Sequence, residues 1–387
     1  MVKSPEAHRI GIFTGGGIAP GLNRVIFGAA AELKKYGHDV IGIPEGWKGM
    51  LEVRRDIMRL SDMNRWELSK LFRNGGTKLG SSRTKIDEAQ YPTVKQVARD
   101  YGLDGVIAIG GDDTLGQAAR LHEEDILRCI GVPKTIDNDV HGTDRTFGFD
   151  SAVQEAALFI ERMSTDAESM RRVAAVELMG RGAGHITIQA AYAGGAHITL
   201  IPERPIPEEL LMKRIREIFN ARGHVIIAIA EGYGQKDEGE KDSFGNVHME
   251  GAAKTLLAAI KKKTKLPTQE QIAGYHVRNG PPLAHDGNFA AELGAAAGLL
   301  AHEELYGNMV ALRDGKITAI PLSDVRGGRL VSEDEYDPDT MMKRDVPPSF
   351  IRSMRKLQAQ EEPYIPAGLP IDVVQRMRES GGPEDDY

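Results

Sequence analysis

Two glycine-rich turns carry the residues with the clearest chemical potential. Gly15-Gly16-Gly17 follows a β-branched run at residues 10–14, and Gly110-Gly111-Asp112-Asp113-Thr114 ends a second apolar run. Glycine lets backbone N–H groups approach a polyanion, and the start of the following helix favours negative charge. Neither turn continues as the Gly-Lys-Ser/Thr of a P-loop, and the dinucleotide pattern GxGxxG is missing. Together the two turns predict a phosphate site at the carboxyl ends of strands.

Carboxylates lie among these glycines, where they repel a phosphate unless a metal or a proton transfer intervenes. Asp112 and Asp113 follow one predicted strand, and Asp137 and Asp139 stand in PKTIDND after another. Mg²⁺ is typically held by one or two carboxylates plus phosphate oxygens, and a further carboxylate can act as a general base. The alternative for each is helix N-capping, the commoner role of an isolated loop aspartate. Their crowding with glycine and lysine favours the chemical role.

Four arginines, Arg83, Arg172, Arg181 and Arg278, are candidates for binding phosphate. The guanidinium group presents paired donors that match phosphate oxygens. The alternative for any one of them is a solvated surface arginine. For Arg181 and Arg278 the phosphate-binding role is favoured, since each follows a strand pattern and lies near glycine.

Strand and helix patterns alternate along the chain in the rhythm of a parallel sheet covered by helices. We expect strands at 10–14, 39–43, 105–109, 129–132, 173–178, 198–201 and 225–230, and helices at 24–35, 91–101, 115–122, 151–163, 186–192, 208–220 and 290–301. This predicts an α/β protein with two units in tandem. Residues 235–247 are charged and predict a surface excursion, and the last residues predict a frayed end.

Composition narrows the class of protein further. The formal charge of −7 argues against non-specific nucleic-acid binding. No apolar run approaches the roughly 18 residues that span a membrane, and the first residues lack the apolar segment of a signal peptide. The single cysteine, Cys129, excludes an internal disulfide framework and predicts a cytoplasmic protein. No HExxH pair supports a zinc hydrolase.

The order of the motifs identifies a resemblance. The segments GGDDT, PKTIDND, GTDRTFGFDSA, ELMGRGAGH, IPE, AEG and YHVRNGPP follow one another as in the phosphofructokinases, and the likeness runs from about residue 8 to 300. The resemblance implies phosphoryl transfer to the 1-hydroxyl of fructose 6-phosphate, as in glycolysis and gluconeogenesis. It also implies two Rossmann-like three-layer domains with mostly parallel sheets and the active site in the cleft between them.

Site roles follow from the resemblance, motif by motif. Asp137 is expected to be the base, Asp112 the Mg²⁺ ligand and Gly16 a donor contact. Arg83 and Arg181 are expected to stabilise the transferring group. The sugar phosphate is expected to contact Thr135, Ile136, Asp137, Arg172, Met179, Gly180, Arg181, Glu231, Tyr275 and Arg278. Arg172 matches a position that reaches the neighbouring subunit's site, which implies a homodimer or homotetramer.

Two further residues bear on the phosphoryl donor. ATP-using members of the family typically have glycine where this chain has Asp113, and a small residue in place of Lys134, whereas pyrophosphate-dependent members carry the Asp and Lys pair. A carboxylate at 113 places bulk and charge where the α-phosphate of a nucleotide would lie. Lys134 supplies a cation for pyrophosphate. The resemblance therefore implies a pyrophosphate-dependent enzyme.

The chain also departs from the family pattern. Gln269 replaces an arginine of the sugar-phosphate site, which Lys265 could replace in function, and Phe27 and Ala31 stand where regulated enzymes carry effector-binding arginines. An ATP-dependent kinase and a non-catalytic sugar-phosphate sensor remain the alternatives. Sedoheptulose 7-phosphate is a conceivable second acceptor.

The domains are expected to interleave along the chain. We assign residues 1–148 and about 277–304 to a donor domain, and 149–276 and about 305–387 to a sugar-phosphate domain with a C-terminal extension.

Overall fold

The structure is a computed structural model that describes residues 7–234, 251–325, 327–332 and 335–336. The chain divides into two compact units, Met1–Val331 and Ser332–Tyr387. All helices and strands of the described residues lie in the first unit. The expected surface excursion at 235–247 and the expected frayed end lie outside the described residues.

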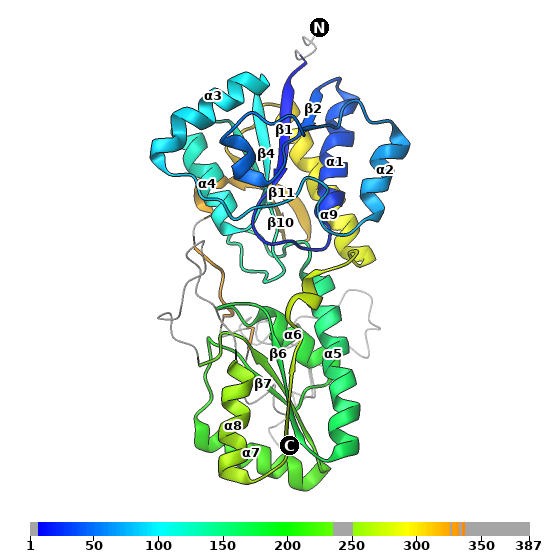
Figure 1. The fold of residues 1–387 in the computed structure, drawn as a ribbon, viewed down its shortest axis with the longest axis vertical. Helices are drawn as coiled ribbons and strands as arrows, with labels where there is room; N and C mark the ends of the chain where they lie inside the picture. Colours follow the sequence, from blue (N-terminus) through cyan, green and yellow to red (C-terminus); the bar gives the residue numbers. More distant parts are fainter. Residues whose placement is uncertain (1–6, 235–250, 326, 333–334, 337–387) are drawn as a thin grey trace, which may run out of the picture. The chain divides into compact units, whose positions relative to one another are not determined.

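Five strands from residues 9–133 and two from residues 308–321 form a seven-stranded sheet in the order β11-β10-β5-β4-β1-β2-β3 (Figure 1). Its strands are β1 (Arg9–Thr14), β2 (Asp39–Gly42), β3 (Met58–Arg59), β4 (Gly105–Gly110), β5 (Cys129–Pro133), β10 (Asn308–Arg313) and β11 (Lys316–Pro321). The inner pairs are parallel, and the two edge pairs, β2–β3 and β10–β11, are antiparallel. The carboxyl ends of β1, β4 and β5 therefore meet at one edge of this sheet.

Helices cover both faces of the seven-stranded sheet, and every residue of its central strand β4 is therefore buried. The helices are α1 (Leu22–Lys35), α2 (Arg65–Arg73), α3 (Tyr91–Tyr101), α4 (Asp112–Glu123) and α9 (Ala284–His302), with short 3₁₀ turns η1 (Gly46–Met50), η2 (Glu88–Gln90) and η4 (Leu322–Asp324). One apolar cluster joins α1, α2 and α9 to one face, and a second joins α3 and α4 to the other.

A four-stranded, wholly parallel sheet follows, in the order β7-β8-β6-β9. Its elements are β6 (Val173–Leu178), β7 (Ile198–Leu200), β8 (Val225–Ala230), β9 (Thr268–Ile272), α5 (Phe149–Met170), α6 (His185–Gly194), α7 (Glu208–Arg222), α8 (Ala252–Thr264) and η3 (Gly274–Arg278). One apolar cluster joins α5 and α6 to one face, and another joins α7 and α8 to the opposite face.

The predicted α/β class with mostly parallel sheets is confirmed. The helix at 151–163 was predicted too short, because α5 continues to Met170 through residues that are mostly exposed. Residues 308–321, which we placed in the sugar-phosphate domain, form β10 and β11 and extend the first sheet beyond β5. Met309 of β10 pairs with Gly131 of β5, and this pairing places residues 308–321 in the first sheet. A local sequence pattern does not predict such a contact between distant strands.

Close helix packing fixes the start of α1, which follows the first glycine turn. A Cβ on Gly28 would lie 2.1 Å from the carbonyl oxygen of Ala291, and one on Gly294 would lie 2.2 Å from that of Val25. Only glycine permits α1 and α9 to approach so closely at these points. This packing against α9 fixes α1, the helix that follows the first glycine turn.

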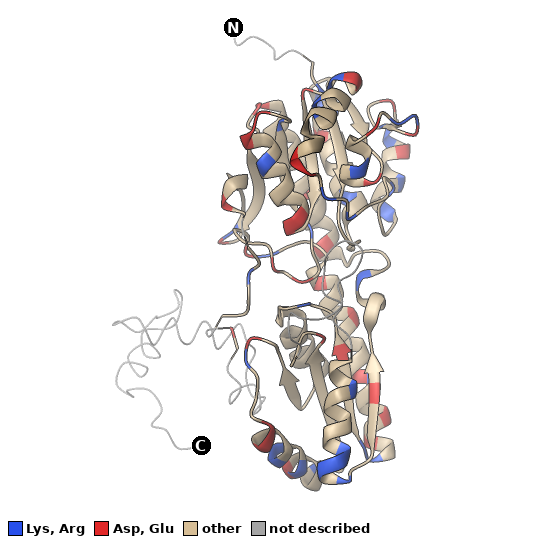
Figure 2. Cartoon of the chain, turned by 60° about the vertical axis from the view of Figure 1, so that its left-hand side comes forward, with Lys and Arg blue, Asp and Glu red and all other residues tan. Residues whose placement is uncertain are grey.

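Charged residues of both signs are interspersed over the helices of the first sheet (Figure 2). A local run of basic residues, Lys261, Lys262 and Lys263, ends α8. Among the described residues, no helix is both long and apolar enough to cross a bilayer.

Candidate active site

The first glycine turn is held by backbone contacts on both sides. Gly16 has a φ of 79°, in the left-handed region, and its N–H donates to the carbonyl of Ser82 at 2.8 Å. A Cβ on Gly16 would lie 3.2 Å from Lys134 Nζ, and one on Gly17 would lie 3.1 Å from Arg278 Nη1. Two cations therefore approach the turn at the points where it carries no side chain.

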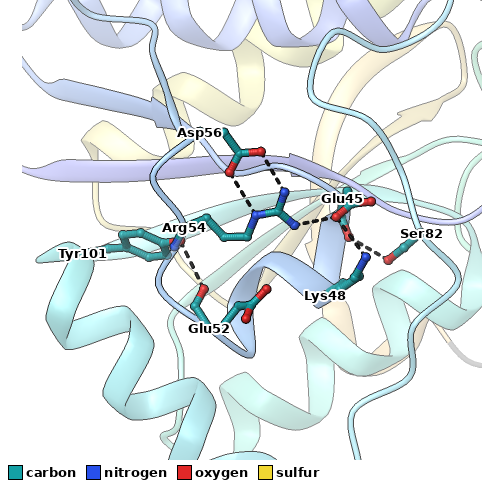
Figure 3. A network of polar contacts seen from close by, with 7 residues as sticks. All are labelled: Glu45, Lys48, Glu52, Arg54, Asp56, Ser82 and Tyr101. Carbon is teal, nitrogen blue, oxygen red and sulfur yellow. Dashed lines mark hydrogen bonds and ion pairs between the residues drawn. The ribbon is translucent and has the colours of Figure 1, made fainter.

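A polar network supports the segment that carries Ser82 and Arg83 (Figure 3). Ser82 Oγ donates to the carbonyl of Glu45 at 2.6 Å. Arg54 donates to the Glu45 carboxylate and, through two nitrogens at 2.9 and 2.7 Å, to Asp56. Hydrogen bonds from Arg54 and Lys48 hold the pKa of Glu45 below its usual value. The network ties the loop after β2 to the segment beside the glycine turn.

The second glycine turn presents two carboxylates in different settings. Asp112 begins α4, and its buried Oδ1 has no hydrogen-bond partner among the described residues. Burial, with the charges of Asp139 and Asp113, raises the pKa of Asp112 to about 7. Asp113 is exposed and forms an ion pair of 3.3 Å with Lys85. Asp112 therefore faces the interior of the site, whereas Asp113 lies at its rim.

The loop after β5 brings a buried cation and a buried carboxylate together. Lys134 is 5% exposed, and burial lowers its pKa to about 8. Asp137 has a buried Oδ1 without a partner among the described residues. Burial, together with Asp139 and Glu231, raises the pKa of Asp137 to about 7. At neutral pH the ammonium is mostly charged, and the carboxyl exists in both protonation states.

The second sheet contributes an arginine on a strained turn after β6. Gly180 has a φ of 145° and Arg181 a φ of 49°. Glu231, at the end of β8, accepts hydrogen bonds from the N–H of Arg181 at 2.8 Å and of Gly180 at 3.3 Å. A non-glycine residue at positive φ persists where surrounding contacts hold it. Glu231 thus supports the turn that presents Arg181.

The sequence pattern predicted that Arg278 directly follows a strand. In the structure it lies at the end of the 3₁₀ turn η3. Its guanidinium stacks over the ring of Tyr275 at 4.3 Å. Its buried Nε has no hydrogen-bond partner among the described residues. Burial lowers the pKa of Arg278. The group is thus held against an aromatic face.

One pocket of about 280 Å³ collects most of the predicted residues. Its lining includes Gly16, Arg83, Asp112, Asp113, Lys134, Thr135, Ile136, Asp137, Met179, Arg181 and Arg278. Gly17, Ile18, Gly111, Thr114 and Asp139 also line it. The resemblance gave none of them a role, although Asp139 was a candidate carboxylate. Gly17, Gly111 and Thr114 belong to the two glycine turns, so their turn position was the available signal.

Four of the predicted substrate residues do not line this pocket. Gly180 and Glu231 shape the Arg181 turn behind it, and Tyr275 supports Arg278. Arg172 is engaged elsewhere, since its Nη1 donates to Gln269 Oε1 at 2.6 Å. Arg172 directly precedes β6, and Gln269 is the second residue of the neighbouring strand β9.

A larger cavity of about 600 Å³ adjoins the pocket at Asp112 and Asp113. Its lining also includes Ile86, Gln117 and Val325. Gln117 is buried, and its Oε1 accepts the N–H of Ile86 at 3.3 Å. The cavity carries charges of both signs and lies on the far side of the Asp113 rim.

A group with metal-ligand geometry occurs away from the pocket, at Asp150, His285 and Asp286. Asp286 accepts hydrogen bonds from the N–H of Gly148 and from both the N–H and the hydroxyl of Ser151. Asp150 pairs with Arg145 and with His285. These contacts give the group a structural role at the start of α5, where Asp286 caps the helix.

Comparison with known proteins identifies the class of this α/β protein. The phosphofructokinase family model matches residues 9–300. An ATP-dependent 6-phosphofructokinase of Mycobacterium tuberculosis (strain H37Rv) is 40% identical over 341 residues, which cover 85% of this chain and 98% of the relative. The pyrophosphate–fructose 6-phosphate 1-phosphotransferase of Thermoproteus tenax is 38% identical over 327 residues, covering 84% and 95%.

The crystal structure of a pyrophosphate-dependent phosphofructokinase from Marinobacter aquaeolei shares the fold, with a TM-score of 0.75 and 22% identity over 94% of this chain and 95% of that one. This chain belongs to the phosphofructokinase family. It is an enzyme of the phosphofructokinase type, as the resemblance implied. Relatives named for ATP and relatives named for pyrophosphate are similarly close in sequence to this chain.

Proposed function

We propose that this chain transfers a phosphoryl group reversibly from pyrophosphate to the 1-hydroxyl of fructose 6-phosphate, yielding fructose 1,6-bisphosphate and phosphate. The observation that carries the proposal is the buried Lys134 beside Gly16, with Asp113 at the rim. Such an enzyme would serve glycolysis and gluconeogenesis in the cytoplasm.

Asp137 is the proposed base. Its pKa of about 7 leaves much of the carboxyl deprotonated at neutral pH, so its free Oδ1 can accept the proton of the 1-hydroxyl. The sugar oxygen then forms a bond to the nearer phosphorus, and the bond from that phosphorus to the bridging oxygen breaks. The electron pair of the broken bond leaves with the departing phosphate. Lys134, Arg181 and Arg83 surround the pocket and stabilise the charge.

Asp112 is the proposed Mg²⁺ ligand. Its Oδ1 is buried and has no hydrogen-bond partner among the described residues. Burial, together with neighbouring carboxylates, raises its pKa, and carboxylate oxygens are the ligands that a hard cation prefers. When bound, Mg²⁺ would neutralise part of the charge of the phosphate oxygens. Without a cation, like charges within the pocket disfavour ionisation of Asp112.

The donor is proposed from two residues of opposite charge. Lys134 supplies a dehydrated cation beside the glycine turn, where pyrophosphate would lie. Asp113 places a carboxylate at the boundary with the larger cavity, although Lys85 partly offsets its charge. An ATP donor would have to pass its α-phosphate across this carboxylate.

An ATP-dependent kinase is the second candidate, and one observation favours it. The adjoining cavity of about 600 Å³ is large enough for a nucleoside, so space alone does not exclude ATP. If the enzyme is pyrophosphate-dependent, as proposed, ATP is excluded by the charge and bulk of Asp113.

The sugar phosphate is proposed to bind between the Asp137 loop and the second sheet. Its contacts are Thr135, Ile136, Met179, Gly180, Arg181, Glu231, Tyr275 and Arg278. Arg172 is proposed to reach the site of a neighbouring copy in a homodimer or homotetramer. Exposed apolar side chains support such an association. They are Ile272 at the end of edge strand β9, Tyr275 shortly after it and Met170 at the end of α5, with exposures of 48%, 62% and 55%.

Product analysis tests the reaction itself. Purified protein is incubated with fructose 6-phosphate, Mg²⁺ and pyrophosphate, and phosphorus NMR should record fructose 1,6-bisphosphate and phosphate in equal amounts. Fructose 1,6-bisphosphate with phosphate should regenerate pyrophosphate at a measurable rate. Turnover with ATP alone would replace the first candidate with the second.

A further inference from the structure

A short segment beyond the part matched by the family model lies against the loop after β5 that carries Asp137. Residues Gly327–Val331, here called the strap, follow β11 and η4. Gly328 forms an antiparallel bridge with Val140, and the N–H of Arg329 donates to the carbonyl of Asp139 at 2.6 Å. Asp139 is two residues from Asp137. The strap therefore holds the backbone that carries the proposed base.

The same segment is tied to the second sheet. The carbonyl of Arg329 lies 3.3 Å from Nε2 of His185, at the start of α6. The N–H of Val331 donates to Glu203 Oε1 at 3.0 Å, and this oxygen also accepts the N–H of Gly184 at 2.9 Å. Gly184 and His185 follow the turn that carries Arg181. In Figure 1 the strap is part of the orange segment that leaves the first sheet.

Burial fixes the segment at both ends. Val325, just before the strap, is 4% exposed within the apolar cluster of α3 and α4, and Val331 is 6% exposed. Between them, a Cβ on Gly328 would lie 3.7 Å from Asp112 Oδ2. The strap thus passes close to the proposed metal ligand, and moving it would break the hydrogen bond to the Asp139 carbonyl.

We propose that the strap is a positioning element that sets Asp137 against Arg181, with the backbone N–H of Arg329 as its principal contact. The inference rests on the proposed function, because Asp137 matters only if phosphoryl transfer occurs there. Misplacement of a reacting group by about 1 Å can cost about 100-fold in rate. The strap contacts the loop that carries the base, and none of its residues lines the pocket of about 280 Å³, so its loss should act on kcat more than on KM.

Proline substitution tests the contact directly, because proline removes the N–H. Arg329→Pro in the full chain should lower kcat by 10-fold or more, with KM for both substrates within threefold. Arg329→Ala keeps the N–H and removes the guanidinium with its contact to the carbonyl of Asp144, so its kcat should stay within twofold. Leu330→Pro places the same ring at the next, exposed position and controls for proline itself.

Hydrogen exchange provides a readout that is independent of turnover. Amides of residues 135–140 should exchange faster in Arg329→Pro than in Arg329→Ala, while those of β4 stay protected. Equal kcat and equal exchange in the two variants would overturn the proposal. An inactive wild-type protein would instead overturn the proposed function and leave the exchange result to judge the strap.

The other end of the strap offers a second test if Arg329→Pro does not fold. Glu203→Gln keeps an oxygen that can accept the N–H groups of Gly184 and Val331, whereas Glu203→Leu does not. The leucine variant should lose kcat at unchanged KM and the glutamine variant should retain it. Equal kcat in two folded variants would refute the link between strap and catalysis.

Discussion

Replacing Lys134 by methionine should separate catalysis from stability. The fall of its pKa from 10.5 to about 8 reflects the cost of holding an ammonium group in a buried site. At 1.36 kcal/mol for each pKa unit, that cost is about 3 kcal/mol. A bound polyanion offsets it. Methionine fills a similar volume without the charge, so the free protein no longer bears this cost.

Proton linkage gives the sign of the stability effect. The folded state binds the Lys134 proton less tightly than the unfolded state, so the lysine lowers stability below pH 10.5, and fully so below about pH 8. At pH 7, Lys134→Met should therefore unfold at the same temperature as the wild type or a higher one. Asp137 and Asp139 lose an attractive partner, which offsets part of the gain.

Activity should change in the opposite direction. Loss of one preorganised charge-stabilising donor typically costs about 2.7–4 kcal/mol, or about 10²–10³ in rate. We therefore expect kcat/KM for pyrophosphate to fall by that factor, measured by coupled assay at saturating fructose 6-phosphate. Lys78→Met, at an exposed lysine of a nearby loop, is the matched control. A large loss of thermal stability in Lys134→Met, or an unchanged kcat/KM, would refute the reasoning.

Three further outcomes are expected. Asp137→Asn should lower kcat by about 10²–10⁴ while thermal unfolding is no earlier, because a general base is lost and a buried charge removed; a rate near that of the wild type would exclude the role. Asp113→Gly should raise kcat/KM for ATP relative to pyrophosphate, and an unchanged ratio would show that this carboxylate does not select the donor. His38, whose Nδ1 accepts the N–H of His8 at 3.0 Å and whose Nε2 lies 3.0 Å from His302 Nδ1, has a pKa lowered first by burial. It therefore contributes stability above its unfolded pKa of about 6.5 that is lost as pH falls. Urea unfolding at pH 7 and pH 5 should show a smaller loss in His38→Gln; an equal loss would exclude His38 as the source.

The core of the fold could be predicted from the sequence because its strands are apolar and bounded by glycine. Val173–Leu178 and Val225–Ala230 were predicted to the residue. In contrast, β9 (Thr268–Ile272) reads TQEQI and is an edge strand with exposed residues, so periodicity gave no signal. Its pairing with β6 exists only through tertiary contact.

Some features of the site could likewise be predicted from local sequence, and others could not. Asp112 and Lys134 follow the buried strands β4 and β5. Ligands of open α/β sheets bind at the carboxyl ends of strands, so both residues could be predicted from the sequence. The hydrogen bonds of Glu231 to the Arg181 turn, and of Arg329 to Asp139, join residues far apart in sequence. No local pattern encodes such contacts, because they depend on how two sheets and a strap come together.

The ratio of kcat/KM for pyrophosphate to that for ATP, in the unmodified protein with fructose 6-phosphate and Mg²⁺, tests the central claim most directly. If Lys134 binds the donor and Asp113 excludes the nucleotide, pyrophosphate should be preferred by at least 100-fold. A preference for ATP would contradict the account of the donor site, even with the fold and the family unchanged.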